Sequence, residues 1–405
     1  MTAAVGPVRI DAAPLEYEAR LDGVRAFAVV IVMLFHFAVL AEPLFVGGLV
    51  GVDIFFVLSG FLITNLLLDE QRRDRGVDFR GFYHRRILRL FPAMYAVLAL
   101  YAVVAVFVGR KYPVVWAELA AAALYSYHLF LGFFGFPSPG SPRALFHLWS
   151  LSVEEWFYFF WPLTLVAAIA TVKRQRVLVV LSVAFITFWM SVRLTAPLFD
   201  VDLSATAEAP FRNADLPYGA QVLYRFSIMR FDMLVLGCLL AFVRRRPQLL
   251  DGPRGSRVLD VLAGAGALLL TAEILLGGRV AFFTAFQSVG FNLALLGIAP
   301  VLLWIHRHGD SHVSRLLALP LAVWIGKRSY GLYLWHEVLN PLVPGAGGKA
   351  GLLVRIVFLF AASFGLAELS WRFIESPFLR RKARQYGRAG QRRPAGSSGP
   401  ADAPT

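Results

Sequence analysis

Ten apolar stretches, each long enough to cross a lipid bilayer, restrict what this 405-residue chain can fold into. A membrane-spanning helix needs about 20 mostly apolar residues, and inside hydrocarbon it makes all its backbone hydrogen bonds internally. Only 16% of the residues are charged, whereas soluble domains contain about 25%. The sequence therefore predicts an all-α, polytopic membrane helix bundle. The ten stretches are 25–42, 49–68, 87–108, 151–171, 177–195, 227–243, 258–276, 281–305, 317–340 and 351–373.

The lysines and arginines of the connections predict how these helices are oriented. Residues 69–89 contain seven arginines, which places this connection and the N-terminus in the cytoplasm. An eleventh apolar stretch, 117–135, determines the orientation of the helices that follow it. If it crossed the membrane, the 17 positive residues of the later basic connections and the tail would lie outside. We therefore expect ten crossings of the cell membrane with both termini cytoplasmic. Residues 117–150 would then lie on the outer face or dip into it.

The expected organisation is one membrane domain between two cytoplasmic ends. Residues 1–20 form a loose leader, residues 21–378 the membrane domain, and residues 379–405 a basic tail expected to be disordered. The first apolar run is long enough to remain as an anchor, so no cleavable signal peptide is expected. The single cysteine, Cys238, excludes an internal disulfide and a cysteine-based metal cluster. Because the +14 net charge sits in short blocks between apolar runs, it indicates membrane orientation rather than nucleic-acid binding.

The first apolar helix contains an arginine near its start and a histidine at membrane depth. Arg25 and His36 are eleven residues apart, which is about three helical turns, so they share one face and lie roughly 16 Å apart along the axis. An ionisable side chain at that depth is costly and usually faces a bundle interior or a wet cavity. We interpret His36 as a functional residue. The alternative is a core histidine hydrogen-bonded to a neighbouring hydroxyl or carbonyl group.

Several other predicted spans place ionisable residues in the middle-to-outer half of the bundle, as a site between helices requires. Each has a structural alternative. Glu154 and its neighbour Glu155 point about 100° apart on a helix, so only one is expected to face inward. Arg230 and Asp232 could form an ordinary boundary pair, and His336 lies close to the interface. The expected members besides His36 are Asp53, Glu154, Arg230, Asp232 and His336. Of these, Glu154 is assigned to catalysis. The other four are assigned to acceptor binding.

Three arginines at the cytoplasmic mouth of the third span form a second candidate site. Arg85, Arg86 and Arg89 are spaced three and four residues apart, so they fan over one arc of the helix. Any cytoplasmic helix end can look like this. However, the guanidinium fork suits phosphate groups, and Arg25 lies at the same membrane level. A phosphate-rich group held there could extend a thin arm of roughly 16 Å to His36.

In order and spacing, these motifs resemble those of the acyltransferase 3 family of integral-membrane O-acyltransferases, which act on O-antigens, exopolysaccharides and macrolides. The resemblance covers residues 21–378. It implies a bundle of roughly ten spans, acyl-CoA as the donor and a hydroxyl group, commonly on a sugar, as the acceptor. The matching segments are LDGVRAFAVVIVMLFH, GGLVGVDIFFVLSGFLIT, RRILRLFPAMY, HLWSLSVEEWFYFFWPL, RFDMLVLGCLLA, SYGLYLWH and FIESPF.

The resemblance also assigns roles to individual residues. His36 matches the essential histidine of the family, Arg25 its arginine partner, and Glu154 the glutamate that follows the Ser-x-Ser-Val run. Arg85, Arg86 and Arg89 match the Arg-Arg-x-x-Arg motif expected to bind acyl-CoA. The implied partners are acyl-CoA, a hydroxyl-bearing glycan or glycosylated acceptor, and the lipid bilayer, with no permanently bound cofactor and no metal.

The favoured interpretation is transfer of an acyl group from a thioester to a hydroxyl group. His36 would take the hydroxyl proton as a general base, or would carry the acyl group covalently. Glu154 would orient that imidazole or bind the acceptor. A rival interpretation is a proton-coupled transporter or flippase, although the chain lacks the repeated halves typical of that class. A third keeps acyl transfer but uses a cytosolic macrolide-type acceptor. Cys238, in an apolar run, is interpreted as packing.

Overall fold

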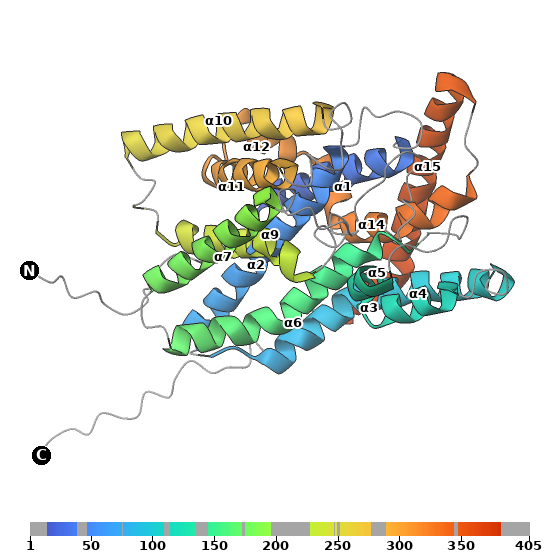
Figure 1. Ribbon diagram of the computed structural model, residues 1–405, viewed down its shortest axis with the longest axis horizontal. Coiled ribbons are helices and arrows are strands. Elements are labelled where there is room, and N and C mark those ends of the chain that lie inside the picture. Colours follow the sequence, from blue (N-terminus) through green and yellow to red (C-terminus); the bar gives the residue numbers. More distant parts are fainter. Residues whose placement is uncertain are drawn as a thin grey trace, which may run out of the picture.

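The computed structural model describes eleven segments of the chain, and they are helical (Figure 1). The described residues are 14–38, 47–74, 76–108, 114–134, 145–171, 175–195, 227–246, 248, 252–276, 289–343 and 347–381. Most of the predicted leader and of the basic tail, together with residues 196–226, lie outside them. No strand occurs in the described segments, so the all-α membrane bundle is confirmed.

The helices follow the predicted apolar stretches closely. They are α1 (Ala19–Ala38), α2 (Val50–Asp74), α3 (Phe79–Val108), α4 (Val114–Ala123), α5 (Tyr127–Phe134), α6 (Leu148–Thr171), α7 (Gln175–Thr195), α9 (Ser227–Arg244), α10 (Pro253–Leu276), α11 (Phe291–Arg307), α12 (His312–Leu317), α13 (Pro320–Lys327), α14 (Ser329–Leu339) and α15 (Gly348–Ser370).

Seven described helices are long and apolar enough to cross a membrane: α1, α2, α3, α6, α7, α10 and α15. The three remaining predicted spans are α9, which carries Arg230 and Asp232, the shorter α11, and the stretch 317–340. That last stretch is broken at Arg328 into α13 and α14. The number of crossings and the side of each terminus remain predictions.

The ambiguous stretch 117–135 contains two short helices instead of one continuous helix. α4 and α5 are separated by a turn at Tyr125, whose φ of 51° interrupts the helix. The Ser126 hydroxyl donates to the Ala121 carbonyl oxygen at 3.1 Å and helps to close that turn. Neither helix alone has the length of a transmembrane span.

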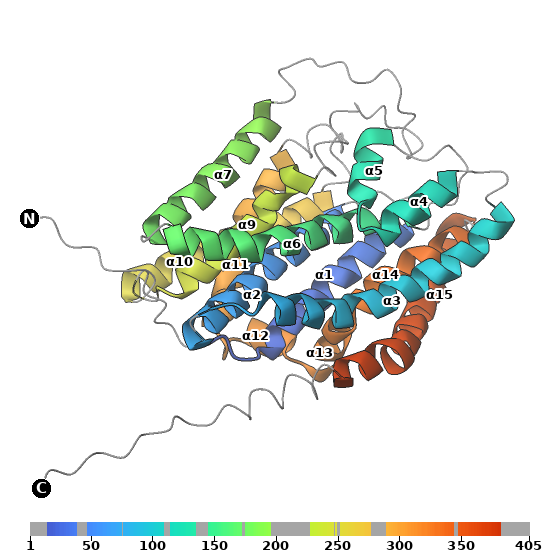
Figure 2. The same ribbon diagram turned by 90° about the horizontal axis from the view of Figure 1, so that it is seen from below.

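α1 runs through the middle of the bundle, between α2 and α14 (Figure 2). It packs against α2, α13, α14 and α15. Small residues permit this approach. A Cβ on Gly23 of α1 would meet the Leu317 carbonyl oxygen at 2.0 Å, and one on Gly326 of α13 would meet the Asp22 carbonyl oxygen at 1.9 Å. Close backbone contact through small residues is typical of packed membrane helices.

The outer helices expose apolar side chains, as a surface facing lipid requires. On α3 Phe107 is 80% exposed, on α6 Phe159 is 57% exposed, and on α15 Val354 is 69% exposed. In water such an exposed apolar surface would favour aggregation. The bundle therefore has a buried centre around α1 and α2 and an apolar periphery.

Candidate active site

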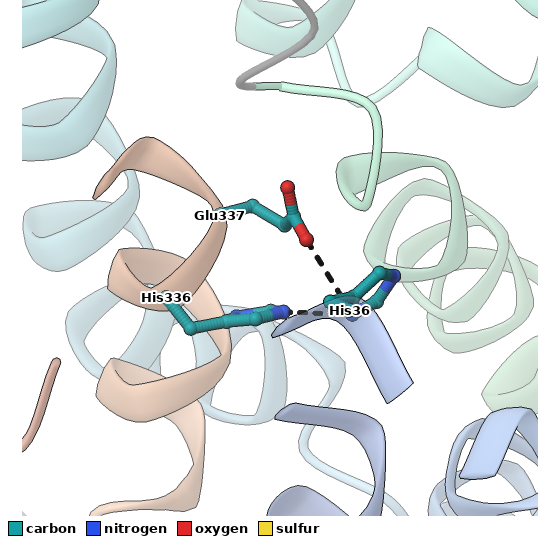
Figure 3. Close-up of side chains that lie close together, drawn as sticks. All are labelled: His36, His336 and Glu337. Carbon is teal, nitrogen blue, oxygen red and sulfur yellow. Dashed lines mark hydrogen bonds and ion pairs between the residues drawn. The ribbon is translucent and has the colours of Figure 1, made fainter. Parts of the chain in front are cut away.

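His36, in the last turn of α1, lies beside His336 and Glu337 of α14 (Figure 3). The His36 Nδ1 and His336 Nε2 atoms are 3.0 Å apart, and the Glu337 Oε1 atom is 3.7 Å from His36 Nδ1. The three residues come from helices 300 positions apart in the sequence. The spacing of residues within the first predicted span could not reveal that His336 is the partner of His36.

Hydrogen bonding fixes which His36 nitrogen is free to act. His336 Nδ1 lies 2.8 Å from the Tyr333 carbonyl oxygen, which can only accept, so His336 carries its proton on Nδ1. Its Nε2 is then an acceptor in the neutral ring, and His36 Nδ1 donates to it. His36 Nε2 is left with an unprotonated lone pair, which is the form that a general base needs.

A second group of contacts anchors this end of α1. Asn340 donates through Nδ2 to the His36 carbonyl oxygen at 3.1 Å and to Glu337 Oε1 at 3.2 Å. Arg355 of α15 donates to the Asn340 Oδ1 atom at 2.6 Å and to the Phe37 carbonyl oxygen at 2.7 Å. These bonds connect α1, α14 and α15 around the histidine pair, and they hold its geometry.

A third histidine, His147, joins the cluster directly before α6. Its ring lies 5.2 Å from the ring of His336 and 5.4 Å from that of Tyr333, measured between centroids. The Tyr333 hydroxyl and the Ser150 hydroxyl are 2.6 Å apart, and both lie 3.1 Å from the His147 carbonyl oxygen, to which each can donate. The sequence analysis did not select His147, although it opens the quoted HLWSLSVEEW segment.

A cavity begins at the Ser150 and Tyr333 side chains, which separate it from the histidine cluster. Ser150 and Tyr333 line it next to the histidines, and Arg25, Arg86 and Arg89 line it as well. It contains about 770 Å³ of space not filled by atoms, including open solvent. A second cavity shares the same three arginines and continues to Arg85 and Asp69 at the end predicted to face the cytoplasm. The cavities therefore connect the arginines to Tyr333, whose ring packs against His147 and His336.

The arginines differ in their partners. Arg86 Nε lies 3.3 Å from Glu155 Oε1, and the guanidinium carbon is 3.1 Å from the centre of the Tyr158 ring. Arg25 lies 3.4 Å from Asp22 Oδ1, and Arg85 lies 3.4 Å from Glu70 Oε2. Arg89 is exposed to the cavity and makes no ion pair with any described carboxylate.

Glu154 belongs to the cavity rather than to the histidine pair. The Ser59 and Tyr158 hydroxyls donate to its Oε1 atom. Among the described residues it makes no contact with His36. The geometry therefore gives the position beside the imidazole to His336 and Glu337, neither of which lies near Glu154 in the sequence.

Asp53, Arg230 and Asp232 form a separate cluster. Arg230 of α9 pairs with Asp53 of α2, and Arg193 of α7 pairs with Asp232. The side chains of both pairs are at most 2% exposed. Arg193 Nε also donates to Asn292 Oδ1 of α11 at 3.0 Å. The expected single cluster of polar residues is therefore divided into a histidine group, a cavity group and this ion-pair group.

Cys238 of α9 is buried, with its sulfur 3.2 Å from the Leu234 carbonyl oxygen. It lies against Gly60 of α2 at a close helix contact, where a Cβ on Gly60 would meet the Leu234 carbonyl oxygen at 1.9 Å. The only described residues that could share a metal ion are His36, His336 and Glu337, whose ligand atoms lie within 4.8 Å of one another. The hydrogen bond between the two imidazoles already accounts for their approach.

Comparison with known proteins shows the family to which the chain belongs. Residues 18–372 match the family model described as an acyltransferase domain. The chain belongs to this acyltransferase family. It is 32% identical over 377 residues to the peptidoglycan O-acetyltransferase OatA of Listeria monocytogenes. It is 34% identical over 376 residues to the putative peptidoglycan O-acetyltransferase YrhL of Bacillus subtilis.

These alignments cover 89% and 91% of this chain but only 56% of each relative, so the chain spans just over half of their length. No solved structure matches it significantly. The chain is therefore a multi-pass membrane member of the acyltransferase family, which argues against the transporter alternative.

Proposed function

We propose that this acyltransferase moves an acyl group, in the simplest case acetyl, from acyl-CoA to a hydroxyl group of a cell-surface glycan, with His36 as the general base. The observation that carries the proposal is the cavity that begins among Arg25, Arg86 and Arg89 and ends at Tyr333 and Ser150, against the histidine cluster.

The donor fits this path in charge and in length. Guanidinium groups bind phosphate oxygens through paired, charge-assisted hydrogen bonds. Arg89 supports the assignment most directly, because it lines the cavity without a close ion pair to a described carboxylate, although Glu154 and Glu155 lie near enough to act on its charge. From the level of Arg25 to that of His36 the distance along α1 is roughly 16 Å. The pantetheine arm of a coenzyme A thioester is long and thin enough for such a passage.

The imidazole supplies the proton transfer. The acceptor hydroxyl oxygen attacks the carbonyl carbon of the thioester while His36 Nε2 removes its proton. The carbon–sulfur bond then breaks, the ester remains on the acceptor, and the coenzyme A thiolate leaves and is protonated by the imidazolium. His336, held by the Tyr333 carbonyl oxygen, keeps the His36 ring in the tautomer that this step needs.

The acceptor assignment rests on the relatives. Two of them are named as peptidoglycan O-acetyltransferases, one of them putatively, and peptidoglycan is a hydroxyl-bearing glycan. Because those proteins extend well beyond the region that matches this chain, peptidoglycan is proposed here as the representative of its chemical class. Asp53, Arg230 and Asp232, predicted from the sequence to bind the acceptor, are engaged in ion pairs. The proposed acceptor position is therefore beside Tyr333 and Ser150, next to the histidine cluster.

The test uses the full chain in lipid nanodiscs with acetyl-CoA labelled on the acetyl group and a soluble peptidoglycan fragment. We expect labelled ester on the glycan, identified by mass spectrometry and released by mild base. If no labelled ester formed on the glycan and acetyl-CoA stayed intact, the proposed function would be contradicted. Acetyl recovered on His36 in rapidly quenched samples would replace the general-base step by a covalent one.

A further inference from the structure

His147 is a buried histidine that no part of the proposed reaction yet uses. It is 1% exposed, and neither ring nitrogen makes a well-aligned hydrogen bond with a described residue, a weak contact with the Leu334 backbone excepted. A neutral imidazole always carries one N–H donor and one acceptor. Burying such a group without a partner destabilises the fold, and a native orphan of this kind calls for an explanation.

The position of His147 indicates what would use that donor. Its ring contacts His336, the residue bonded to His36, at a centroid distance of 5.2 Å. Its carbonyl oxygen lies within 3.1 Å of the Tyr333 and Ser150 hydroxyls, both of which line the cavity. His147 therefore lies between the two hydroxyls that line the cavity and the residue bonded to His36.

We propose that His147 is a second catalytic residue, whose ring N–H donates a hydrogen bond to the acyl carbonyl oxygen of the donor. The proposal rests on the proposed function. As the hydroxyl oxygen bonds to the carbonyl carbon and His36 Nε2 takes the hydroxyl proton, negative charge develops on the carbonyl oxygen. The His147 N–H stabilises that charge, and the carbon–sulfur bond then breaks with the thiolate leaving. His147 keeps its proton throughout.

The surroundings make such a donor effective. A hydrogen bond to a developing oxyanion is strongest in a site closed to water, where the donor is held in place before the reaction. His147 is packed among the rings of His336 and Tyr333, and its backbone is held by two hydroxyls. An unpartnered N–H in the resting protein is the state expected of a donor whose acceptor arrives with the substrate.

The chain contains a matched control. His128 in α5 is also fully buried, with both nitrogens unpartnered among the described residues. Its ring lies against Trp156, with the centroids 5.4 Å apart, away from the three-histidine cluster. A purely structural role for a buried histidine should therefore affect both positions alike.

The experiment compares His147→Leu, which has no donor, with His147→Asn and His147→Gln, which retain an amide N–H, and with His128→Leu. Turnover of acetyl-CoA with the soluble peptidoglycan fragment is measured per folded protein, with the affinity for acetyl-CoA measured separately. Loss of one oxyanion donor lowers kcat about 10²–10³-fold. We expect that loss for His147→Leu at unchanged acetyl-CoA affinity, at least ~10-fold recovery in one amide variant, and little change for His128→Leu.

A direct signature accompanies the kinetics. The infrared C=O stretch of a bound, unreactive ketone analogue of acetyl-CoA should lie at lower frequency in the unchanged protein and in the amide variant than in His147→Leu. Equal kcat in His147→Leu and His128→Leu, or an unshifted stretch, would overturn the proposal. If His36→Ala turned over normally, the proposed function itself would fail; loss in His36→Ala without loss in His147→Leu would remove only the role of His147.

Discussion

The histidine cluster and the Asp53–Arg230–Asp232–Arg193 cluster both bury ionisable groups within the bundle, yet they use them differently. In the ion-pair cluster each charge faces an opposite charge, across α2, α7 and α9. In the histidine cluster the neutral His36 ring keeps a free lone pair, and His147 keeps unused nitrogens, beside a cavity. Burial of a polar group alone does not identify a site, whereas unused bonding capacity next to a cavity does.

The largest expected effect concerns the histidine cluster. His36→Ala removes the base, so transfer to the peptidoglycan fragment should fall by about 10²–10⁴-fold. The midpoint of thermal unfolding and the affinity for acetyl-CoA should stay close to those of the unchanged protein, because the arginines proposed to bind the phosphates line the cavity and do not contact His36. Near-normal transfer would make His36 a packing residue and would erase the difference between the two clusters.

The ion-pair cluster should respond in the opposite way. Arg230→Leu leaves Asp53 as an unpaired buried charge, and breaking such a pair costs about 3–5 kcal/mol of stability. The measurement is the free energy of unfolding in detergent, with activity expressed per folded molecule. The double variant Asp53→Leu, Arg230→Leu should recover most of the stability. Folded Arg230→Leu protein without transfer activity would indicate that this cluster also belongs to the active site.

The cavity arginines should show a graded effect on the donor. Each lost charge-assisted contact weakens binding by about 10- to 100-fold. Arg89→Ala and Arg86→Ala should each raise the dissociation constant of acetyl-CoA within this range. Arg85→Ala should have less effect, because Arg85 lines only the outer cavity and pairs with Glu70. Unchanged affinity in the triple variant would leave these arginines with a role in membrane orientation only.

The smallest effect is expected at the layer between cavity and histidines. Tyr333→Phe keeps the ring but removes the hydroxyl that bonds Ser150 and the His147 carbonyl oxygen. Neutral hydrogen bonds of this kind contribute about 1 kcal/mol, so kcat should fall by less than roughly 10-fold at unchanged donor affinity. A loss as large as that of His36→Ala would show that the hydroxyl itself takes part in the chemistry.

The sequence predicts what depends on position within one helix. The spacing of Arg25 and His36 predicts that both lie on one face of α1; Arg25 lines both cavities, whereas His36 lies against His336. It could not predict which helices meet. His336 finds His36 across 300 residues, whereas Glu154 turns toward Ser59 and Tyr158.

His147 could not be singled out from the sequence, for a physical reason. It precedes its helix instead of lying within an apolar run, so no argument from membrane depth applied to it. Its importance appears only when three chain segments fold together and leave its nitrogens without partners.

The central claim is that the donor lies with its phosphates among the arginines and its acyl group at His36. An acyl-CoA carrying a photoreactive group on the acyl chain tests this directly, with the labelled peptides identified by mass spectrometry. We predict labelling of residues near the end of α1, in α14 and around His147, and competition by unlabelled acetyl-CoA. Competed labelling confined to α9 and α11, around the Arg230 ion pairs, would contradict the proposed path.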